Sequence, residues 1–334
     1  MKKLSTALIV FLICALSFAQ PVITKIGTYK CGRQPKQVLF SPDSKFIVLP
    51  LLDDNGFDIF SVADKKVIQR INPPDAKKVG FAEGLFIPEK KVFLVSQMTT
   101  ANVYEYSYPG FQYLRTIPTG GVWSKFIEYS KEKNLLCVSN WCSNDISLID
   151  YDTGKVVRII KTAAAPRGLL FTENSKYIIA LCYEGGKIQK FEVDTGKKVA
   201  EISITNSAMR HIAVNREETK AYISEMYYNK IYEVDLASFK IVREVKTYSH
   251  PNTINLYNNR WLFVSNRGPN NPEDYTKRSP VNGKITIIDT QTMQIVKEYE
   301  GGNQPTGLDI SKKLNILCSS NFQDENIELY EISE

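Results

Sequence analysis

Histidine is scarce in this chain: His211 and His250 are the only two among its 334 residues. A zinc site needs ligands that converge on one ion, and no pair of cysteines stands at metal-ligand spacing with a histidine. Phosphate-binding loops, nucleotide fingerprints and calcium loops are also absent. Ser249 precedes His250, but such a pair without a placed acid and an oxyanion site is not a catalytic triad. We therefore expect no metal, no cofactor and no catalytic residues.

Helical periodicity and long apolar runs are equally scarce. No window sustains an apolar 3.6-residue period beyond two turns. After the first 19 residues, no apolar run reaches the roughly 20 residues that cross a bilayer. Linkers and low-complexity segments are missing too, whereas alternation such as that in residues 230–235 is typical of β-strands. The sequence thus predicts an all-β domain without a transmembrane segment.

The first 19 residues have the pattern of a secretion signal. Two lysines open it, residues 8–16 form an apolar core, and Ser17-Phe18-Ala19 is a small-x-small cleavage site. We expect cleavage before Gln20 and export to the periplasm, the cell surface or the medium. A lipid anchor on Cys14 is the alternative, but the bulky residues 11–13 just before it fit an acylation site poorly.

The rest of the chain repeats about every 43 residues. Seven anchor residues, each ending a short apolar run before a polar turn, are 46, 43, 42, 43, 42 and 54 residues apart. They are Phe40, Phe86, Tyr129, Phe171, Val214, Leu256 and Ile310. Each unit offers four short strands, which at this period is typical of a propeller blade. The sequence therefore predicts a seven-bladed β-propeller over residues 20–334, preceded by a signal peptide over residues 1–19.

One unit also carries a family resemblance. Residues 134–157 contain a strand that ends in Ser139-Asn140, a strand that ends in Ile149-Asp150, and a Thr-Gly-Lys-Val turn. Ser265-Asn266 and the turn Asp194-Thr195-Gly196-Lys197 echo this pattern. The chain thus resembles the YVTN-repeat propellers, a group that includes surface-layer and lactonase-like proteins. The resemblance implies the seven-bladed fold, but little about function, because this fold hosts unrelated activities.

The two ends of the domain are expected to meet in one blade. Residues 21–30 have the pattern of an outer strand, while the last unit stops after its third strand, Ile327-Glu328-Leu329-Tyr330. Pairing these segments closes the ring and removes two open strand edges. On this interpretation residues 331–334 need no further structure.

Five of the six cysteines follow the leader, an odd number that leaves at least one thiol without a partner in the chain. Cys137 and Cys318 occupy equivalent positions in blades that are not neighbours, so we expect both to pack as small buried side chains. Cys142 and Cys182 lie near one end of adjacent blades and are a candidate disulfide. The pairing of Cys31 is left open.

One position of the repeat should face the mouth of the central channel. It holds Lys36, Ala82, Lys125, Arg167, Arg210, Asn252 and Thr306. Four of the seven are basic, and we expect their side chains to be exposed. Clustered cations between low-dielectric walls attract anions, and arginine grips carboxylate or phosphate at two points. Glu83 and His211 stand one residue further in, and His250 lies at the start of the next blade.

The candidate ligand site therefore comprises Lys36, Glu83, Lys125, Arg167, Arg210, His211 and His250. Aromatic residues near these positions, among them Trp123, Trp141, Tyr183 and Tyr227, are expected to wall the mouth. The alternative is a rim of solvated cations, or of cations paired with Glu83, Glu184 and Glu225.

The largest departure from the repeat is an insertion at residues 268–283. Three prolines and an Asn-Gly pair mark it as a loop, placed between the second and third strands of blade six. A long loop beside a channel mouth is typical of a lid or a partner contact. Its candidate residues are Asn270, Tyr275, Lys277 and Arg278. A drifted insertion without function is the alternative.

Together these features predict an exported, monomeric and non-catalytic protein that binds an anionic or polymeric ligand or an envelope protein. A lactonase-like hydrolase using Glu83, Arg210 and His211 is the first alternative. Nucleic-acid binding is the second, because cations interleaved with aromatic rings hold single strands. The formal charge of +6, which is +4 without the two leader lysines (40 basic against 36 acidic residues), is too mild to favour it.

Overall fold

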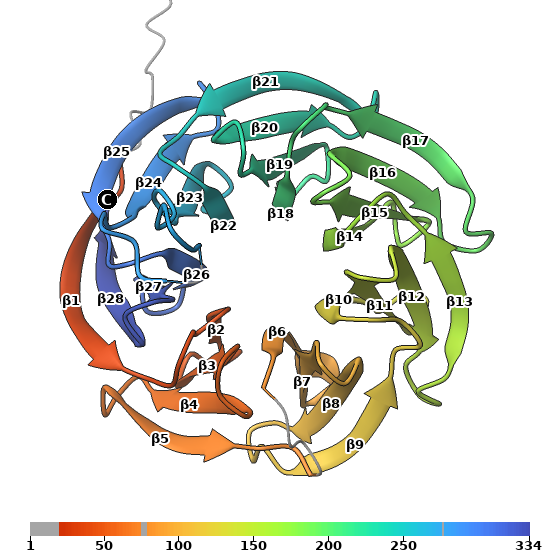
Figure 1. The fold of residues 1–334 in the computed structure, drawn as a ribbon, viewed down its shortest axis with the longest axis horizontal. Helices are drawn as coiled ribbons and strands as arrows, with labels where there is room; N and C mark the ends of the chain where they lie inside the picture. Colours follow the sequence, from red (N-terminus) through yellow and green to blue (C-terminus); the bar gives the residue numbers. More distant parts are fainter. Residues whose placement is uncertain (1–19, 75–78, 276) are drawn as a thin grey trace, which may run out of the picture.

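The computed structural model describes residues 20–74, 79–275 and 277–334. Within them, 28 strands form seven four-stranded sheets, set as blades in a ring around one axis (Figure 1). The seven-bladed propeller predicted from the repeat is confirmed. The predicted signal peptide, with Cys14, lies outside the described residues. Across the described ranges, no helix is long and apolar enough to span a bilayer.

The first four blades follow one another in chain order. Blade one has β2 Leu39–Phe40, β3 Phe46–Pro50, β4 Phe57–Ser61 and β5 Lys66–Ile71. Blade two has β6 Phe81–Ile87, β7 Val92–Gln97, β8 Asn102–Ser107 and β9 Tyr113–Pro118, with the short 3-10 helix η1 Pro88–Lys90 after β6. Blade three has β10 Ser124–Ser130, β11 Leu135–Asn140, β12 Asp145–Asp150 and β13 Val156–Lys161. Blade four has β14 Pro166–Thr172, β15 Tyr177–Cys182, β16 Lys187–Glu192 and β17 Lys198–Ser203.

The last three blades complete the ring. Blade five has β18 Met209–Val214, β19 Lys220–Glu225, β20 Lys230–Asp235 and β21 Lys240–Lys246. Blade six has β22 Pro251–Tyr257, β23 Trp261–Asn266, β24 Lys284–Asp289 and β25 Gln294–Glu300. Blade seven has β26 Pro305–Ser311, β27 Ile316–Asn321, β28 Asn326–Ser333 and β1 Val22–Lys30.

Position within a blade explains the composition of each strand. The second and third strands are covered on both faces by neighbouring blades, so β11 and β12 bury nearly every side chain. The outer strand faces solvent, and all but one residue of β13 is exposed. The apolar core is accordingly a ring of clusters between adjacent sheets rather than one central core.

Blade seven joins the two ends of the chain, as expected. β1 runs antiparallel to β28, with Ile23 opposite Ile332 and Tyr29 opposite Ile327. The expectation that residues 331–334 carry no structure is wrong, because β28 continues to Ser333 and buries Ile332. The apolar side chain of Ile332 has a covered site beside Ile23 only once the outer strand is in place, which the repeat pattern alone did not reveal.

The cysteines in the described residues are all free thiols. Cys137 and Cys318 are fully buried, which confirms their expected role as small core side chains. The candidate disulfide between Cys142 and Cys182 is wrong. Cys142 is exposed, whereas Cys182 ends a strand inside its blade and is fully buried. Residues at one end of adjacent blades thus point in different directions.

Candidate functional site

The first strand of each blade faces the channel, and in blades two to seven a β-bulge interrupts its pairing near its start. In β6, Phe81 pairs with Gln97 and Gly84 pairs with Val95, so Ala82 and Glu83 together oppose one residue. The same irregularity occurs in β10, β14, β18, β22 and β26. A bulge redirects side chains, and the bulge residues Lys125, Arg167 and Arg210 line the cavity at the channel mouth.

A serine in the second strand holds the bulge and links adjacent blades. The Ser265 hydroxyl accepts a hydrogen bond from the backbone N–H of Thr253 at 3.1 Å and donates to the carbonyl oxygen of Thr306 in the next blade at 2.9 Å. Ser96, Ser224 and Ser320 bridge bulge and neighbour in the same way. These serines belong to the repeated Ser-Asn, Ser-Gln and Ser-Glu pairs of the sequence. The serine of the motif therefore connects the bulge of its own blade to the backbone of the next blade.

A second backbone rule builds the rim of the mouth. In blades two to seven the residue after the second strand donates its N–H to the carbonyl of the residue before the first strand, and in blade one Leu52 donates to Gln34 in the same way, at 2.8 to 3.1 Å. The donors are Leu52, Met98, Trp141, Tyr183, Met226, Arg267 and Phe322. All seven line the cavity at the channel mouth. The sequence analysis named Trp141 and Tyr183 among them from their chemistry but missed this shared hydrogen bond. In five blades the donor is marked in the sequence as the residue after the Ser-Asn, Ser-Gln or Ser-Glu pair that ends the second strand.

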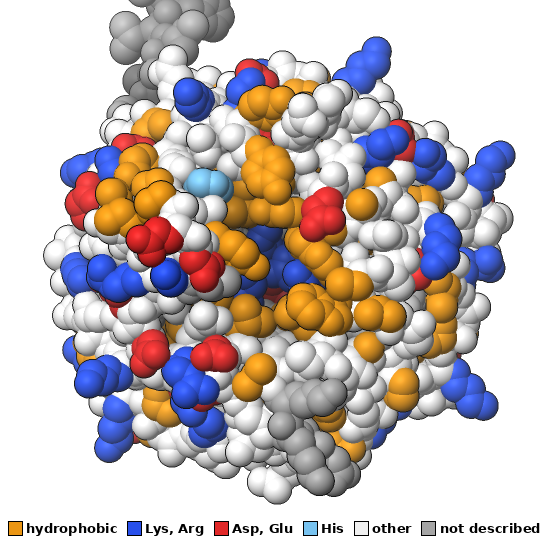
Figure 2. Space-filling model, in the orientation of Figure 1, with side chains coloured by type: hydrophobic (Ala, Val, Ile, Leu, Met, Phe, Trp, Pro, Cys, Tyr) orange, Lys and Arg blue, Asp and Glu red, His pale blue; other side chains and the backbone are white. Residues whose placement is uncertain are grey.

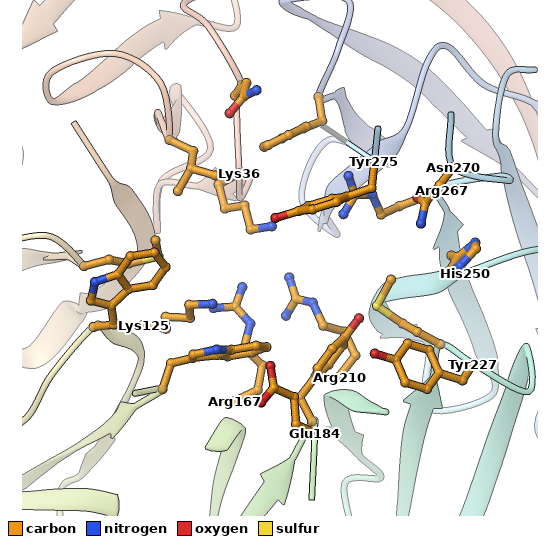
Figure 3. A pocket seen from close by; sticks show the side chains of 18 residues that line it. Lys36, Lys125, Arg167, Glu184, Arg210, Tyr227, His250, Arg267, Asn270 and Tyr275 are labelled. Carbon is orange, nitrogen blue, oxygen red and sulfur yellow. The ribbon is translucent and has the colours of Figure 1, made fainter. Parts of the chain in front are cut away.

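The bulge residues and the seven rim residues together line a cavity of about 610 Å³. The space-filling view shows it as a hollow on the ring axis, with cationic side chains at its base and apolar side chains around it (Figure 2). Five cationic residues line the cavity: Lys36, Lys125, Arg167, Arg210 and Arg267. Their side chains converge on the axis from different blades (Figure 3). Among the described residues that line the cavity, Glu184 is the one carboxylate.

The expectation that these cations are exposed is wrong for the two arginines at the base. Arg167 is 1% exposed and Arg210 is 4% exposed. Lys36 and Lys125 are half-buried. Both guanidiniums are directed into the ring, where they meet the carboxylate of Glu83 from blade two, and this places them inside the ring and not on its surface. Burying several positive charges together costs free energy in the absence of a counter-charge. The same cluster produces a strong positive potential that attracts an anion.

Glu83 lies beneath the cationic residues and offsets part of their charge. Its buried carboxylate accepts an ion-paired hydrogen bond from Arg167, two blades away, and stands 3.9 Å from Nη2 of Arg210. Within the part of the chain that the structure describes, Nη1 of Arg167 and both Nη atoms of Arg210 have no hydrogen-bond partner. Buried donors of this kind are costly, and an anion is the natural partner for them. Glu225, in contrast, caps the backbone N–H groups of Ala208 and Tyr228.

The pKa values follow from burial and crowding. Burial, and then the guanidiniums of Arg210 and Arg167, lowers the pKa of the Lys36 amine well below its usual value. Burial and Arg167 lower the pKa of Arg210 to about 9. Burial lowers the pKa of Arg267 to about 10. Folding therefore disfavours the state in which all these cationic side chains are protonated. A bound anion would stabilise that fully charged state.

Aromatic contacts hold several of the cations in place. Nζ of Lys125 lies 3.3 Å from the ring centroid of Trp141, a cation–π contact. Lys36 and Arg267 both lie over the ring of Phe322, at 5.1 and 5.2 Å from its centroid. The predicted aromatic wall is therefore in direct contact with the cations of the mouth.

The two histidines do not form a pair across the mouth. His250 lines the cavity, and its Nδ1 lies 2.9 Å from the carbonyl oxygen of Gly268. His211 packs edge-on against Phe126, with ring centroids 5.7 Å apart, and is absent from the cavity lining. With Glu83 ion-paired to Arg167 and Nδ1 of His211 without a partner among the described residues, these groups are not arranged as a general acid and base. No cluster of three or more metal-ligating side chains occurs in the described residues.

We expect His211 to make the stability of the protein depend on pH. Burial, reinforced by Arg210 and Arg167, lowers its pKa from 6.5 to about 3. Between these values the unfolded chain binds a proton that the folded chain does not, so stability falls as the pH drops below 6.5. From pH 6.5 to 5.0 we expect a loss of up to about 1.4 kcal/mol per pH unit from this residue. Urea denaturation at both pH values should show a smaller loss in His211→Gln; an identical loss would contradict the assignment.

The inserted loop contributes two of its four candidate residues to the site. Asn270 and Tyr275 line the cavity. Lys277 and Arg278 do not; Lys277 forms an ion pair with Glu273 at 3.1 Å, and Arg278 with Asp324 at 3.0 Å. The loop is attached to blade seven through Asn303, whose amide donates to the carbonyl of Ser279. The predicted place of the insertion, on the face of the mouth, is thus confirmed.

Comparison with known proteins finds a sequence similarity that extends over nearly the whole domain. The chain is 35% identical to antigen Lp49 of Leptospira interrogans serogroup Icterohaemorrhagiae serovar copenhageni (strain Fiocruz L1-130) over 316 residues. The match covers 91% of this chain and 69% of that antigen. No family model matches the chain. Membership of the YVTN-repeat group therefore stays a prediction.

Proposed function

The chain belongs to the family of leptospiral antigen Lp49, and we propose that it is an exported, non-catalytic binding protein that holds an anionic ligand in the mouth of its central channel. The name of the relative, an antigen, supports a place outside the cytoplasm. The serine-held bulges also support assignment to the YVTN-repeat propellers, because they give the repeated Ser-Asn pairs a shared structural role.

The observation that carries the proposal is the set of buried, unpaired guanidinium donors at the base of the cavity. Arg210 is almost fully buried, and neither of its Nη atoms has a hydrogen-bond partner among the described residues. Glu83 neutralises only part of the cluster, since Lys36, Lys125 and Arg267 also line the cavity. Buried N–H donors without partners destabilise a fold unless they serve a ligand. Carboxylate and phosphate are the groups that match guanidinium donors.

The test is a titration of the protein with citrate and with acetate at equal ionic strength. A trianion reaches several of the converging cations at once, so citrate should raise the melting temperature in a saturable way and acetate should not. Added NaCl should weaken the citrate effect by screening. Equal responses to citrate and acetate, or none to either, would show that the cations are a structural feature without a ligand.

A further inference from the structure

We propose that the ligand of the channel mouth is a small polyanion whose charged groups are attached to a flat ring. This inference rests on the proposed function and adds the chemical class of the ligand. It follows from the way blades three, four and five supply both a cationic base and an aromatic wall.

The cationic base calls for more than one negative charge. Lys125, Arg167 and Arg210 occupy one equivalent position in consecutive blades and all line the cavity. The Glu83 carboxylate contacts Arg167 and is 3.9 Å from Arg210. A monoanion would leave an excess of positive charge in a buried site, whereas a group with two or more charges would satisfy the unpaired donors.

The aromatic wall stands on the same three blades. Trp141 and Tyr183 have ring centroids 5.0 Å apart, and Tyr183 and Tyr227 have centroids 5.7 Å apart. The three rings form a continuous series along one side of the mouth. The Tyr227 residue is 52% exposed although it lines the cavity, so its ring retains free surface. Such surfaces bind planar groups by stacking.

Trp123 adds a ring at a position where packing does not explain it. Its backbone is left-handed, with φ of 60°, as it is at the equivalent residues Gly80, Ala165, His250 and Gln304 of other blades. Glycine adopts this conformation without cost, so the backbone does not require an indole here. Trp123 nevertheless lines the cavity and is 44% exposed. The indole is thus presented to the mouth rather than to the core.

The base and the wall are close enough for one ligand to use both. Nζ of Lys125 is 3.3 Å from the centroid of the Trp141 ring, so an anion held by Lys125 places its attached group beside the wall. The labelled side chains in Figure 3 show Lys125, Arg167 and Arg210 directed at the axis with Tyr227 beside them. A flat ring joined to anionic groups matches this arrangement.

The experiment uses two charge-matched pairs of probes, titrated by calorimetry against the protein. One pair is benzene-1,3,5-tricarboxylate and propane-1,2,3-tricarboxylate; the other is ADP and pyrophosphate. We expect the ring-bearing member of at least one pair to bind at least about fivefold more tightly. The pair that shows the preference identifies carboxylate or phosphate as the anionic group.

A variant separates stacking from charge. Trp123→Gly should fold, because glycine accepts the left-handed backbone. It should reduce the preference for the ring-bearing probe and leave the affinity for its ring-free partner unchanged. If citrate binds but neither pair shows a preference, or if Trp123→Gly and a second variant, Tyr227→Ala, both leave it unaltered, the ring inference is overturned and the anion site stands. If citrate and all four probes fail to bind, both proposals fall.

Discussion

Replacing Arg210 by Met is expected to weaken citrate binding by at least about tenfold and, at the same time, to raise the melting temperature of the ligand-free protein. The loss of affinity follows from the removal of a charge-assisted contact, worth about 1.5–3 kcal/mol. The gain in stability follows because Arg210 is buried and repelled by Arg167, and its Nη atoms have no hydrogen-bond partner among the described residues. Met retains the apolar stem of the arginine side chain and needs no hydrogen-bond partner.

Calorimetry with citrate and thermal denaturation without it measure the two effects. Arg158→Met is the matched control, since Arg158 lies on the exposed outer strand β13 and donates to the carbonyl of Asp194. It should leave citrate affinity unchanged. An Arg210→Met protein that is less stable than the wild type would show that this guanidinium serves the fold, and unchanged affinity would remove it from the site.

Replacing Ile23 by Asp is expected to lower the free energy of unfolding by about 3–5 kcal/mol, the range for a charge placed without a partner in a core. Ile23 is 4% exposed and packs with Leu308, Ile332 and other side chains between blades six and seven. Its backbone N–H also donates to the hydroxyl of Tyr299. The closing strand therefore contributes buried surface in addition to backbone pairing.

The neighbouring residue provides the control. Val22 is on the same strand but 39% exposed, so Val22→Asp should change stability by no more than about 0.5 kcal/mol. Urea denaturation of both variants measures the difference. Two variants of equal stability would mean that β1 adds little to the ring, contrary to the closure seen in blade seven.

Most of the fold could be predicted from the repeat of about 43 residues, because the patterns of strands, turns and alternating side chains are local and recur seven times. The same periodicity placed Lys125, Arg167 and Arg210 at one equivalent position, and β10, β14 and β18 confirm this alignment. It also placed the loop of residues 268–283 on the face of the mouth. Side-chain identity at a repeat position is a property of the sequence, and it was sufficient to identify the residues of the candidate site.

What surrounds each side chain was decided by the tertiary structure. Arg167 and Glu83 are 84 residues apart in the chain, and no local pattern indicates that they pair across the channel. The exposure of Arg210, the direction of Cys142 and Cys182, and the continuation of β28 to Ser333 depend in the same way on which blade lies opposite. The sequence repeat determined the position of each residue on the ring. Which residues are buried and which are ion-paired was decided only by closure of the ring, because burial and electrostatic attraction act through space between blades.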